Sequence, residues 1–394
     1  MLDFLKRTWA EIHLDRLRCN FRVIQDSLSP GCRVMAVVKA DAYGHGAAAA
    51  AQALRDAGAS WFGVSNLEEG VQLRRAGIEE PILILSYTPP EEAARLAQFR
   101  ITQAVLSLPY ARQLSAEAER AGVTVRAHLK VDTGMSRVGF FYHGEDPDKT
   151  ADEMAAACRL PALVPEGIFT HFASADEEDD GGFTRRQFAL FMDAVARLEA
   201  RGVTFALRHC CNSAATLRFP EMHLDMVRPG IILYGLAPDG WMRDFLPLEP
   251  VMELKTSVSM VKELPAGATV SYNRQYTAPS RRTVATVPIG YADGYPRSLT
   301  NRADMLVGGR RARVIGRVCM DQCMLDVTGL DVRESMGVTV FGRDGGSLLP
   351  AEEMAGLLGT IPYEVVCQIS KRVPRLFLES GQVVGQLNYI VADV

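Results

Sequence analysis

The stretch Arg33-Val34-Met35-Ala36-Val37-Val38-Lys39 is a short apolar run of strand-forming residues that ends in a charged one. Seven similar runs follow it, at 61–65, 82–86, 102–106, 126–131, 167–171, 205–209 and 226–228. Between them lie segments rich in Ala, Leu, Glu and Arg, such as 66–76, 110–121 and 185–200, with apolar residues at helical spacing. This alternation is typical of a parallel sheet, and eight repeats favour a closed (β/α)₈ TIM barrel.

The pattern changes after about residue 238. Polar and apolar positions alternate there between Gly and Pro residues, as in 253–261, 283–288 and 311–328. Such alternation indicates a mostly-β domain. We therefore expect an α/β chain with a barrel domain at 1–240 and a C-terminal β domain at 241–394. The segment 8–15 precedes the first barrel repeat, and we expect it to pair with the second domain.

Composition narrows the functional class. The net charge is −4 with both signs interspersed, so nothing predicts binding to nucleic acid or to a membrane surface. No apolar run approaches the roughly 20 residues that span a bilayer, and the apolar stretch at 1–7 is too short for a signal peptide, so we expect neither feature. The eight Cys are scattered without zinc-site spacing, which predicts reduced thiols and no metal. These features favour a cytoplasmic protein that acts on a small molecule.

Lys39 is the first candidate for chemistry because it ends the first strand, and barrel active sites form where strands end. Burial lowers the pKa of a lysine, and the free amine then forms an imine with an aldehyde. A lysine that merely reaches solvent from a strand end is an equally good reading of this position alone.

Two groups of hydrogen-bond donors point to a phosphate. Tyr43-Gly44-His45-Gly46 form a turn directly after Lys39, and glycine there allows close backbone approach. Asn212-Ser213 and Pro229-Gly230-Ile231 follow the seventh and eighth strands, where barrels commonly bind phosphate.

A resemblance to a known family rests on longer motifs. Residues 36–46 read AVVKADAYGHG, 129–139 read LKVDTGMSRVG, and shorter motifs follow in order: Thr170-His171-Phe172, Asn212-Ser213-Ala214, Val227-Arg228-Pro229-Gly230-Ile231, Ser271-Tyr272, 289–297 (IGYADGYPR), 318–322 (VCMDQ) and Pro362-Tyr363-Glu364. In this series the chain resembles the alanine racemases, enzymes of fold type III that use pyridoxal 5'-phosphate. The resemblance implies an isomerase that interconverts L- and D-alanine and supplies D-alanine for peptidoglycan.

The resemblance also implies site residues and an assembly. Lys39 would carry the cofactor as a Schiff base, and the other cofactor-binding residues would be Tyr43, His171, Asn212, Ser213, Arg228, Gly230, Ile231 and Tyr363. The family acts as a head-to-tail homodimer in which Tyr272 and Met320 reach the site of the partner subunit. Racemisation needs a proton-transferring group on each face of the substrate, and these groups would be Lys39 and Tyr272.

Two polar residues, His171 and Arg228, would tune the tyrosine base and the cofactor ring. A free tyrosine has a pKa near 10 and is a poor base at neutral pH, so the family stabilises it through His171 and Arg228. Arg228 would face the pyridine nitrogen, and because a guanidinium does not give up its proton readily, the ring would stay unprotonated. Without the resemblance, a core histidine would be the preferred reading of His171.

The substrate would be held by a further set of residues, namely Arg137, Met320, Tyr291 and Asp321. Arg137 corresponds to the arginine that binds the substrate carboxylate. Lys130 matches a lysine that the family often carries as a carbamate, whose negative charge would orient Arg137. Asn273 departs from the glycine found in many members, but Asn tolerates the same left-handed backbone.

Alternative functions remain open at this point. A decarboxylase of the same architecture would need an acidic partner for the ring nitrogen, and Arg228 argues against it. A non-catalytic carrier of pyridoxal phosphate would not need the second domain. A racemase of serine or larger amino acids differs mainly at the entrance, where Tyr363 favours a small side chain.

Overall fold

The computed structural model describes residues 5–142 and 146–391. The chain divides into two compact units. The barrel unit comprises Arg18–Ala42 and Ala47–Leu248, and the β unit comprises Met1–Leu17, Tyr43–Gly46 and Glu249–Val394. The β unit thus includes the N-terminal strand and the short segment that follows Lys39.

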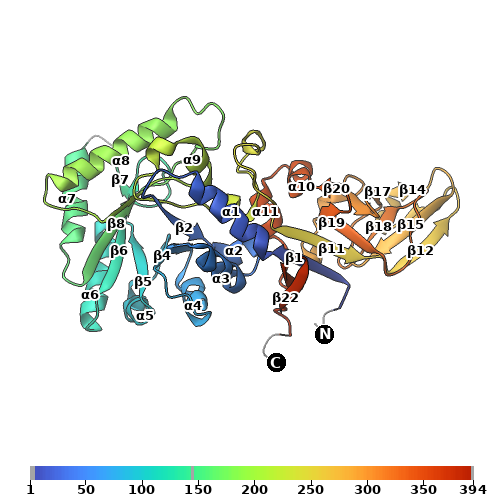
Figure 1. Ribbon diagram of the computed structural model, residues 1–394, viewed down its shortest axis with the longest axis horizontal. Coiled ribbons are helices and arrows are strands. Elements are labelled where there is room, and N and C mark those ends of the chain that lie inside the picture. The colour runs from blue at the N-terminus through green and yellow to red at the C-terminus, as the bar shows by residue number, and fades with distance from the viewer. Residues whose placement is uncertain (1–4, 143–145, 392–394) are drawn as a thin grey trace. The chain divides into compact units, whose positions relative to one another are not determined.

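Eight parallel strands form the barrel, in the order β10-β2-β3-β4-β5-β6-β8-β9. Figure 1 labels β2, β4, β5, β6 and β8 of these strands. The eight strands are β2 (Arg33–Val37), β3 (Trp61–Val64), β4 (Ile82–Ile84), β5 (Ile101–Val105), β6 (Val125–Asp132), β8 (Leu163–Phe169), β9 (Leu207–His209) and β10 (Met226–Val227). Each lies within or beside one of the eight predicted runs. The backbone N–H of Asp225 donates to the Arg208 carbonyl (3.1 Å) and that of Arg228 to the Cys211 carbonyl (2.9 Å), which joins β10 to β9 and closes the ring. The predicted barrel is confirmed.

Helices lie between the strands, at α3 (Ala47–Ala57), α4 (Leu67–Arg75), α5 (Ala93–Gln98), α6 (Leu108–Arg120), α7 (Pro147–Cys158), α8 (Phe183–Glu199) and α9 (Ser213–Arg218), and α1 (Leu14–Asp26) precedes the first strand. Local sequence sets where they begin. Asn66 accepts from the Glu69 backbone N–H to cap α4, and Ser107 does the same for α6 through Tyr110. The barrel interior is filled by Met35, Trp61, Leu83, Ala104, Phe169, Leu207 and Met226.

The β unit contains a mixed sheet in the order β12-β15-β18-β17-β16-β19-β11-β1-β21-β22, with β20 paired to β19. Its strands are β1 (Thr8–His13), β11 (Met252–Ser257), β12 (Met260–Leu264), β15 (Arg282–Val287), β16 (Asp304–Val307), β17 (Arg310–Ile315), β18 (Cys323–Asp326), β19 (Gly337–Asp344), β20 (Ser347–Leu349), β21 (Arg375–Glu379) and β22 (Gln382–Leu387). A separate hairpin joins β13 (Thr269–Val270) to β14 (Tyr276–Thr277). The helices α10 (Ala351–Leu358) and α11 (Pro362–Cys367) complete the unit. β1 pairs antiparallel with β11 and parallel with β21, so the start of the chain is an inner strand of this sheet.

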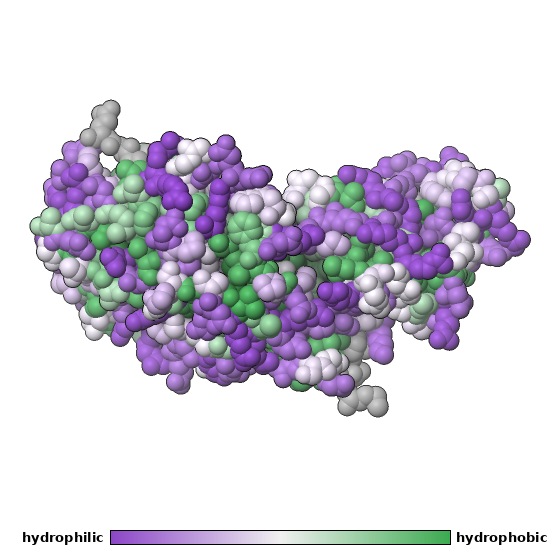
Figure 2. All heavy atoms as spheres, turned by 45° about the horizontal axis from the view of Figure 1, so that its top comes forward, coloured by the Kyte–Doolittle hydropathy of each residue, from purple (hydrophilic) through white to green (hydrophobic). Residues whose placement is uncertain are grey.

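The surface and helix lengths agree with the composition. On the face shown in Figure 2, hydrophilic side chains cover most of the surface and hydrophobic ones form smaller areas. Among the described residues, none of the helices combines the length and the apolar character needed to cross a membrane.

The helix α2 (Lys39–Gly44) has an unusual handedness. Its φ angles are +52° at Ala40, +56° at Asp41, +54° at Ala42 and +53° at Tyr43, and Gly44 follows at +82°. A left-handed helical conformation costs L-residues about 1–2 kcal/mol each, so surrounding contacts must stabilise this turn.

Side chains from other elements supply those contacts. Glu69 accepts from the backbone N–H of Ala40 (2.8 Å) and Asp41 accepts from that of Ala47 (2.8 Å). At the other end of the turn, Nε of the buried Arg375 donates to the Gly44 carbonyl at 3.0 Å. The segment that begins with Lys39 is therefore fixed in a conformation that its own sequence disfavours.

Gly44→Ala should destabilise the protein more than a left-handed backbone alone requires. A Cβ at Gly44 would lie 2.5 Å from the Val366 carbonyl oxygen, whereas Gly77 has a similar φ of +84° and nothing within 4 Å of the added atom. We expect Gly77→Ala to cost about 1 kcal/mol from the backbone conformation and Gly44→Ala clearly more. Thermal unfolding of both variants measures the difference, and equal losses would contradict the steric argument.

Candidate active site

The carboxyl ends of the barrel strands gather the predicted residues of the barrel unit. Lys39 follows β2, His171 follows β8, Asn212 and Ser213 follow β9, and Arg228, Gly230 and Ile231 follow β10. Lys130 lies in β6, and Arg137 lies in the loop after it. This is the end of a barrel where active sites form.

Arg228 is buried among acceptors, with 4% of its surface exposed. Its Nη1 lies 2.8 Å from Nδ1 of His209, and its Nη2 donates to the carbonyls of Thr170 (2.8 Å) and Cys210 (3.0 Å). Burial lowers the pKa of the guanidinium to about 10, so it still carries its charge at neutral pH. Among the described residues, no acceptor faces Nε or the second hydrogen of Nη1, and a guanidinium has five N–H donors. Arg228 thus keeps donors for a ligand acceptor such as a ring nitrogen.

Arg228 also determines which nitrogen of His171 carries the hydrogen. Nη2 of Arg228 lies 3.3 Å from Nδ1 of His171. Because a guanidinium only donates, this Nδ1 accepts. Burial, followed by the charge of Arg228, holds the pKa of His171 well below its usual range. His171 is therefore neutral and has its hydrogen on Nε2, where it is available to a further acceptor.

Four basic side chains act on the pKa of this histidine. After burial, the charges of Arg228, Lys130, Arg137 and Lys39 all lower the pKa of His171. Such a concentration of positive charge favours an anionic ligand.

Lys130 is buried more deeply than Lys39 or Arg137. Its Nζ donates to the Val131 carbonyl at 2.8 Å, and 3% of the residue is exposed. Burial, and then the charge of Arg228, lower the pKa of this amine to about 7. A large fraction is therefore unprotonated at neutral pH.

Gln187 of α8 holds two of the site loops. Its Nε2 donates to the His171 carbonyl (3.2 Å) and its Oε1 accepts from the Ala173 backbone N–H (2.9 Å). Nε2 also lies 3.5 Å from the Thr133 hydroxyl, in the loop that leads to the exposed Arg137. The fully buried Gln187 therefore connects the loop of His171 with that of Arg137.

Polar groups lie in the segments that follow β9 and β10. The Ser213 hydroxyl accepts from the Gly230 backbone N–H at 2.8 Å, and both groups are buried. Asn212 caps α9 by accepting from the Ala215 backbone N–H at 2.9 Å. Ile231 begins a short 3₁₀ turn directly after Gly230. The Ser213 hydroxyl accepts in that bond and still has its own hydrogen, which suits a phosphate oxygen.

The remaining predicted residues belong to the β unit. Tyr43 and Tyr363 lie close together, with ring centroids 6.1 Å apart and ring planes tilted by 56°. Tyr272 and Met320 are 68% and 53% exposed, and Tyr291 is 44% exposed. These three side chains leave much of their surface open to solvent.

The loops of Tyr291 and Met320 are held together by backbone contacts. The Tyr291 N–H donates to the Cys319 carbonyl (3.1 Å) and the Ala292 N–H donates to the Met320 carbonyl (3.0 Å). In the turn of Tyr272, Asn273 has φ +58°, the left-handed conformation expected of it.

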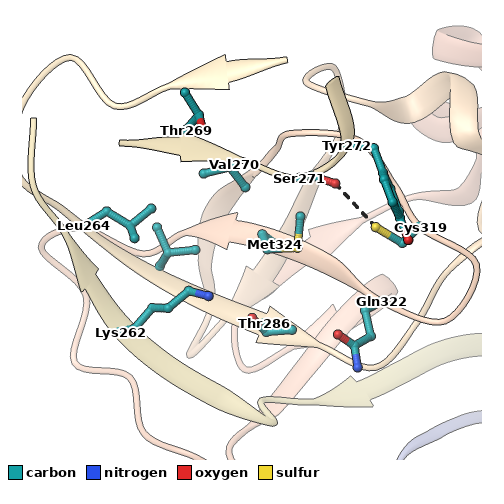
Figure 3. A pocket seen from close by; sticks show the side chains of 11 residues that line it. Lys262, Leu264, Thr269, Val270, Ser271, Tyr272, Thr286, Cys319, Gln322 and Met324 are labelled. Atoms are coloured by element: carbon teal, nitrogen blue, oxygen red, sulfur yellow. Dashed lines mark hydrogen bonds between the residues drawn. The ribbon is translucent and has the colours of Figure 1, made fainter. Parts of the chain in front are cut away.

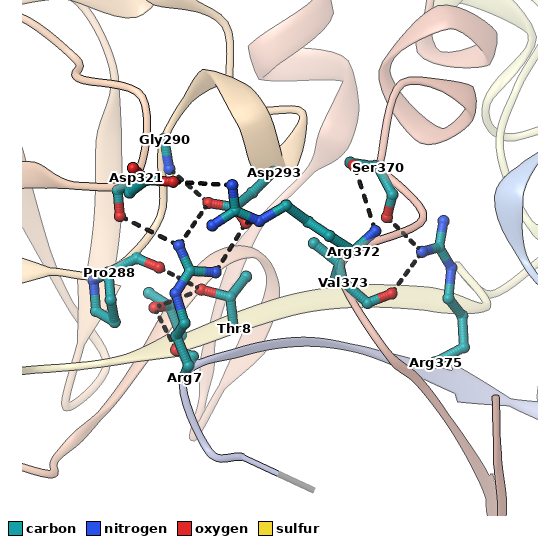
Figure 4. Close-up of polar contacts among 11 residues, drawn as sticks. Arg7, Thr8, Pro288, Gly290, Asp293, Asp321, Ser370, Arg372, Val373 and Arg375 are labelled. Carbon is teal, nitrogen blue, oxygen red and sulfur yellow. Dashed lines mark hydrogen bonds and ion pairs between the residues drawn. The ribbon is translucent and has the colours of Figure 1, made fainter. Parts of the chain in front are cut away.

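A buried carboxylate stabilises the loops of Tyr291 and Met320 (Figure 4). Asp293, with no exposed surface, accepts from Arg7 (2.8 Å) and from the Gly290 backbone N–H (2.9 Å), and it forms an ion pair with Arg372 (3.1 Å). Arg372 also pairs with Asp321 at 2.8 Å. The carboxylate of Asp321 is therefore already engaged within its own unit.

A cavity of about 420 Å³ lies within the β unit beside Tyr272 (Figure 3). In the figure, the Tyr272 ring lies next to Cys319, at the opposite side of the cavity from Lys262. The lining residues are Lys262, Leu264, Thr269, Val270, Ser271, Tyr272, Val284, Thr286, Cys319, Gln322 and Met324. It contains none of the barrel residues described above, so it is not the predicted cofactor site.

Both parts of the chain match known protein families. Residues 12–238 match the family described as alanine racemase, N-terminal domain, and residues 251–377 match alanine racemase, C-terminal domain. The chain belongs to the alanine racemase family. It is 47% identical over 373 residues to the alanine racemase of Desulforamulus reducens, a match that covers 94% of this chain and 98% of the relative.

Solved alanine racemases are similar over nearly the whole chain. The structure from Clostridium difficile 630 has a TM-score of 0.92 at 38% identity and covers 99% of this chain and 100% of its own. The structure from Bartonella henselae, which has covalently bound pyridoxal phosphate, has a TM-score of 0.83 at 27% identity and covers 94% of this chain and 99% of its own.

Membership of the alanine racemase family confirms the resemblance, the barrel fold with its β domain, the isomerase class and the cofactor expected from the sequence. The residues present fit that cofactor. Arg228 has unengaged donors for a ring nitrogen, and the Ser213–Gly230 pair has the polarity that a phosphate needs. Lys39 lies at the same end of the same barrel.

Several residues of this alanine racemase site were not predicted from the sequence. His209, His128 and Gln187 were read as parts of strands or helices, and Arg375 and Asp293 were not singled out. A charged or polar residue within an apolar run is the only available signal for such positions, and it does not indicate a partner.

Proposed function

We propose that the chain interconverts L-alanine and D-alanine with two proton-transferring groups, Lys39 on one face of the bound substrate and Tyr272 of the partner subunit on the other. The setting of Arg228 is the observation that carries this proposal. Its buried, charged guanidinium lies where a decarboxylase would need an acid, and it keeps N–H donors for the cofactor ring. Because a guanidinium does not readily give up its proton, the ring nitrogen would stay unprotonated.

Pyridoxal phosphate, when bound, withdraws electrons from the Cα–H bond of the attached amino acid and makes that proton removable. Ser213, Gly230 and Ile231 would hold its phosphate from the barrel unit, with Asn212 fixing their backbone through its cap of α9. Tyr43 and Tyr363 would donate their phenol hydroxyls to the same group. Lys39 would bind the aldehyde carbon and then, released as an amine, hold or return a proton at Nζ.

Tyr272 needs help to act as a base because a phenol titrates near pH 10 in water. His171 has its hydrogen on Nε2, since its Nδ1 accepts from Arg228. An N–H donated to a phenolate oxygen favours the charged form of the tyrosine and lowers its pKa. We propose this role for His171 towards Tyr272 of the partner subunit.

The substrate carboxylate would bind to Arg137, which is exposed in the loop after β6. The backbone N–H of Met320, with Tyr291 and Asp321 beside it, would complete that end of the site from the partner subunit. A head-to-tail homodimer is supported by the exposure of Tyr272, Met320 and Tyr291. A cytoplasmic location and a role in supplying D-alanine for peptidoglycan belong to the same proposal.

The first test is incubation of L-alanine with the holoenzyme in deuterium oxide, followed by chiral analysis. We expect D-alanine with deuterium at Cα. Lys39→Ala should abolish the reaction and the near-visible absorption band of the bound cofactor. Tyr272→Phe should retain that band and lose racemisation by several orders of magnitude, because one of two bases is missing.

Two results would contradict the proposal. Release of carbon dioxide from an amino acid would indicate a decarboxylase. A cofactor band without any exchange of the α-proton would indicate a carrier. Serine tested in parallel measures the breadth of the site around Tyr363.

The trans arrangement of the bases has its own test, which is to mix the inactive Lys39→Ala and Tyr272→Phe variants. Random subunit exchange makes about half of the dimers mixed, and each mixed dimer has one intact pair of bases out of two, so about one quarter of the wild-type activity should return. Each variant incubated alone is the control. If both bases belong to one subunit, the mixture stays inactive.

Lys130 is proposed to be carbamylated. Its neighbours Arg137 and Arg228 are cationic, so a carbamate anion would remove a repulsion and accept hydrogen bonds from Arg137. The reaction needs the unprotonated amine, and burial has already lowered the pKa of Lys130 to about 7.

The carbamate should therefore form at much lower pH than on an ordinary lysine, whose pKa is about 10.4. With ¹³C-labelled bicarbonate, we expect a ¹³C NMR carbamate signal that grows as pH rises through about 7, since the neutral amine prevails above its pKa. Lys130→Met should remove the signal, and the exposed Lys262→Met should keep it. A signal that survives in Lys130→Met would assign the modification elsewhere.

A further inference from the structure

Two histidines lie behind Arg228 in the barrel interior, and the two-base reaction assigns nothing to them. His209 ends β9 and His128 lies within β6. Neither has any exposed surface. Imidazoles in an apolar barrel core are costly unless their nitrogens have partners.

The two rings form a hydrogen-bonded line from Arg228. Nδ1 of His209 lies 2.8 Å from Nη1 of Arg228, and Nε2 of His209 lies 2.9 Å from Nδ1 of His128. Since the guanidinium only donates, Nδ1 of His209 is an acceptor. Neutral His209 then has its hydrogen on Nε2 and donates to His128. The Nδ1 of His128 therefore accepts, and its hydrogen lies on Nε2, which is buried and has no hydrogen-bond partner among the described residues.

Both imidazoles are held neutral. Burial, and then the charge of Arg228, lower the pKa of His128 to about 3 and that of His209 well below its usual range. A protonated His209 would place an N–H against the guanidinium N–H. The only charge in the line therefore resides on Arg228.

Packing fixes the orientation of each ring. The Phe169 ring stacks on His209 with centroids 4.9 Å apart and planes 4° apart. Trp61 lies against His128 with centroids 5.2 Å apart. Gly167 makes room for His128, because a Cβ at that position would lie 2.6 Å from its ring. The strand register between β6 and β8 is irregular at this residue, between Ala127 and His128.

We propose that His209 and His128 are positioning residues for Arg228. His128 specifies the tautomer of His209, and Nδ1 of His209 gives Nη1 of Arg228 one fixed acceptor. That bond orients the guanidinium plane, so Nη2 reaches His171 and the unengaged N–H groups keep a constant direction. The effect on catalysis rests on the proposed function, whereas the tautomers of the two histidines are a property of the protein itself.

The tautomers are measured by ¹⁵N NMR of the full-length protein without cofactor, labelled at histidine. We expect both His209 and His128 to show a protonated Nε2 and an unprotonated Nδ1, unchanged between pH 6 and pH 9, because burial keeps both rings neutral. His128→Leu should disturb the His209 signals, and His209→Leu should disturb those of His128. A protonated Nδ1 or an imidazolium at His209 would overturn the proposal.

Kinetics of the holoenzyme supply the second readout. Asn places an acceptor oxygen where Nδ1 of histidine lies, whereas Leu has none. We expect His209→Leu to lower kcat by about tenfold to a hundredfold, as is typical when a group that orients a ligand-contacting residue is removed, with little change in KM. His209→Asn should recover most of this loss. Equal kcat values in the two variants would overturn the positioning role.

A matched pair at the next residue separates positioning from general stability. His128→Asn should keep an acceptor for His209 and lose less kcat than His128→Leu, even if both variants unfold at the same temperature. A kcat that follows only the unfolding temperature would reduce both histidines to core packing. If the wild type shows the expected tautomers but no racemisation, the proposed function is wrong, and the hydrogen-bonded arrangement of the two histidines still holds.

Discussion

A buried guanidinium must have its donors satisfied, and the requirement of Arg228 organises the inner end of the barrel. Carbonyls from two neighbouring strands and two histidine nitrogens surround it. Each of these acceptors lies at or directly after the end of a strand. The guanidinium of Arg228 is therefore hydrogen-bonded only when these strands lie side by side in the barrel. The arginine then imposes one tautomer on both histidines, because it can only donate. In this way one charge sets the hydrogen-bond directions of a site that has to handle protons.

A second constraint is the left-handed turn after Lys39. Four non-glycine residues with positive φ store strain that no local sequence preference relieves. Glu69 and Arg375 stabilise the turn from positions far away in the chain. Strain of this kind persists only where the surrounding structure determines the conformation, and it is common at functional sites. The segment after Lys39 therefore continues a barrel strand, and its last residues, Tyr43–Gly46, belong to the β unit.

Much of the architecture could be predicted because it follows from periodicity. The eight apolar runs correspond to the eight barrel strands, since a strand buried on both faces reads as a continuous apolar segment. The alternating pattern after residue 238 predicted the mostly-β domain, because a strand with one buried face alternates apolar and polar residues. Lys39, Arg228 and Ser213 could be chosen because they follow such runs, and the long motif around Lys39 indicated the family and the cofactor.

The sequence by itself thus determined the order of elements, the family and the residue types at the strand ends, because these depend on local pattern. Only the tertiary structure decided which groups became partners. Arg375 and Gly44 are 331 positions apart, and His128 and His209 are 81 apart. No spacing rule connects them, because their contacts exist only once strands from distant repeats lie side by side. The direction of each hydrogen bond and the loss of charge on the buried histidines follow from that proximity and from the exclusion of water.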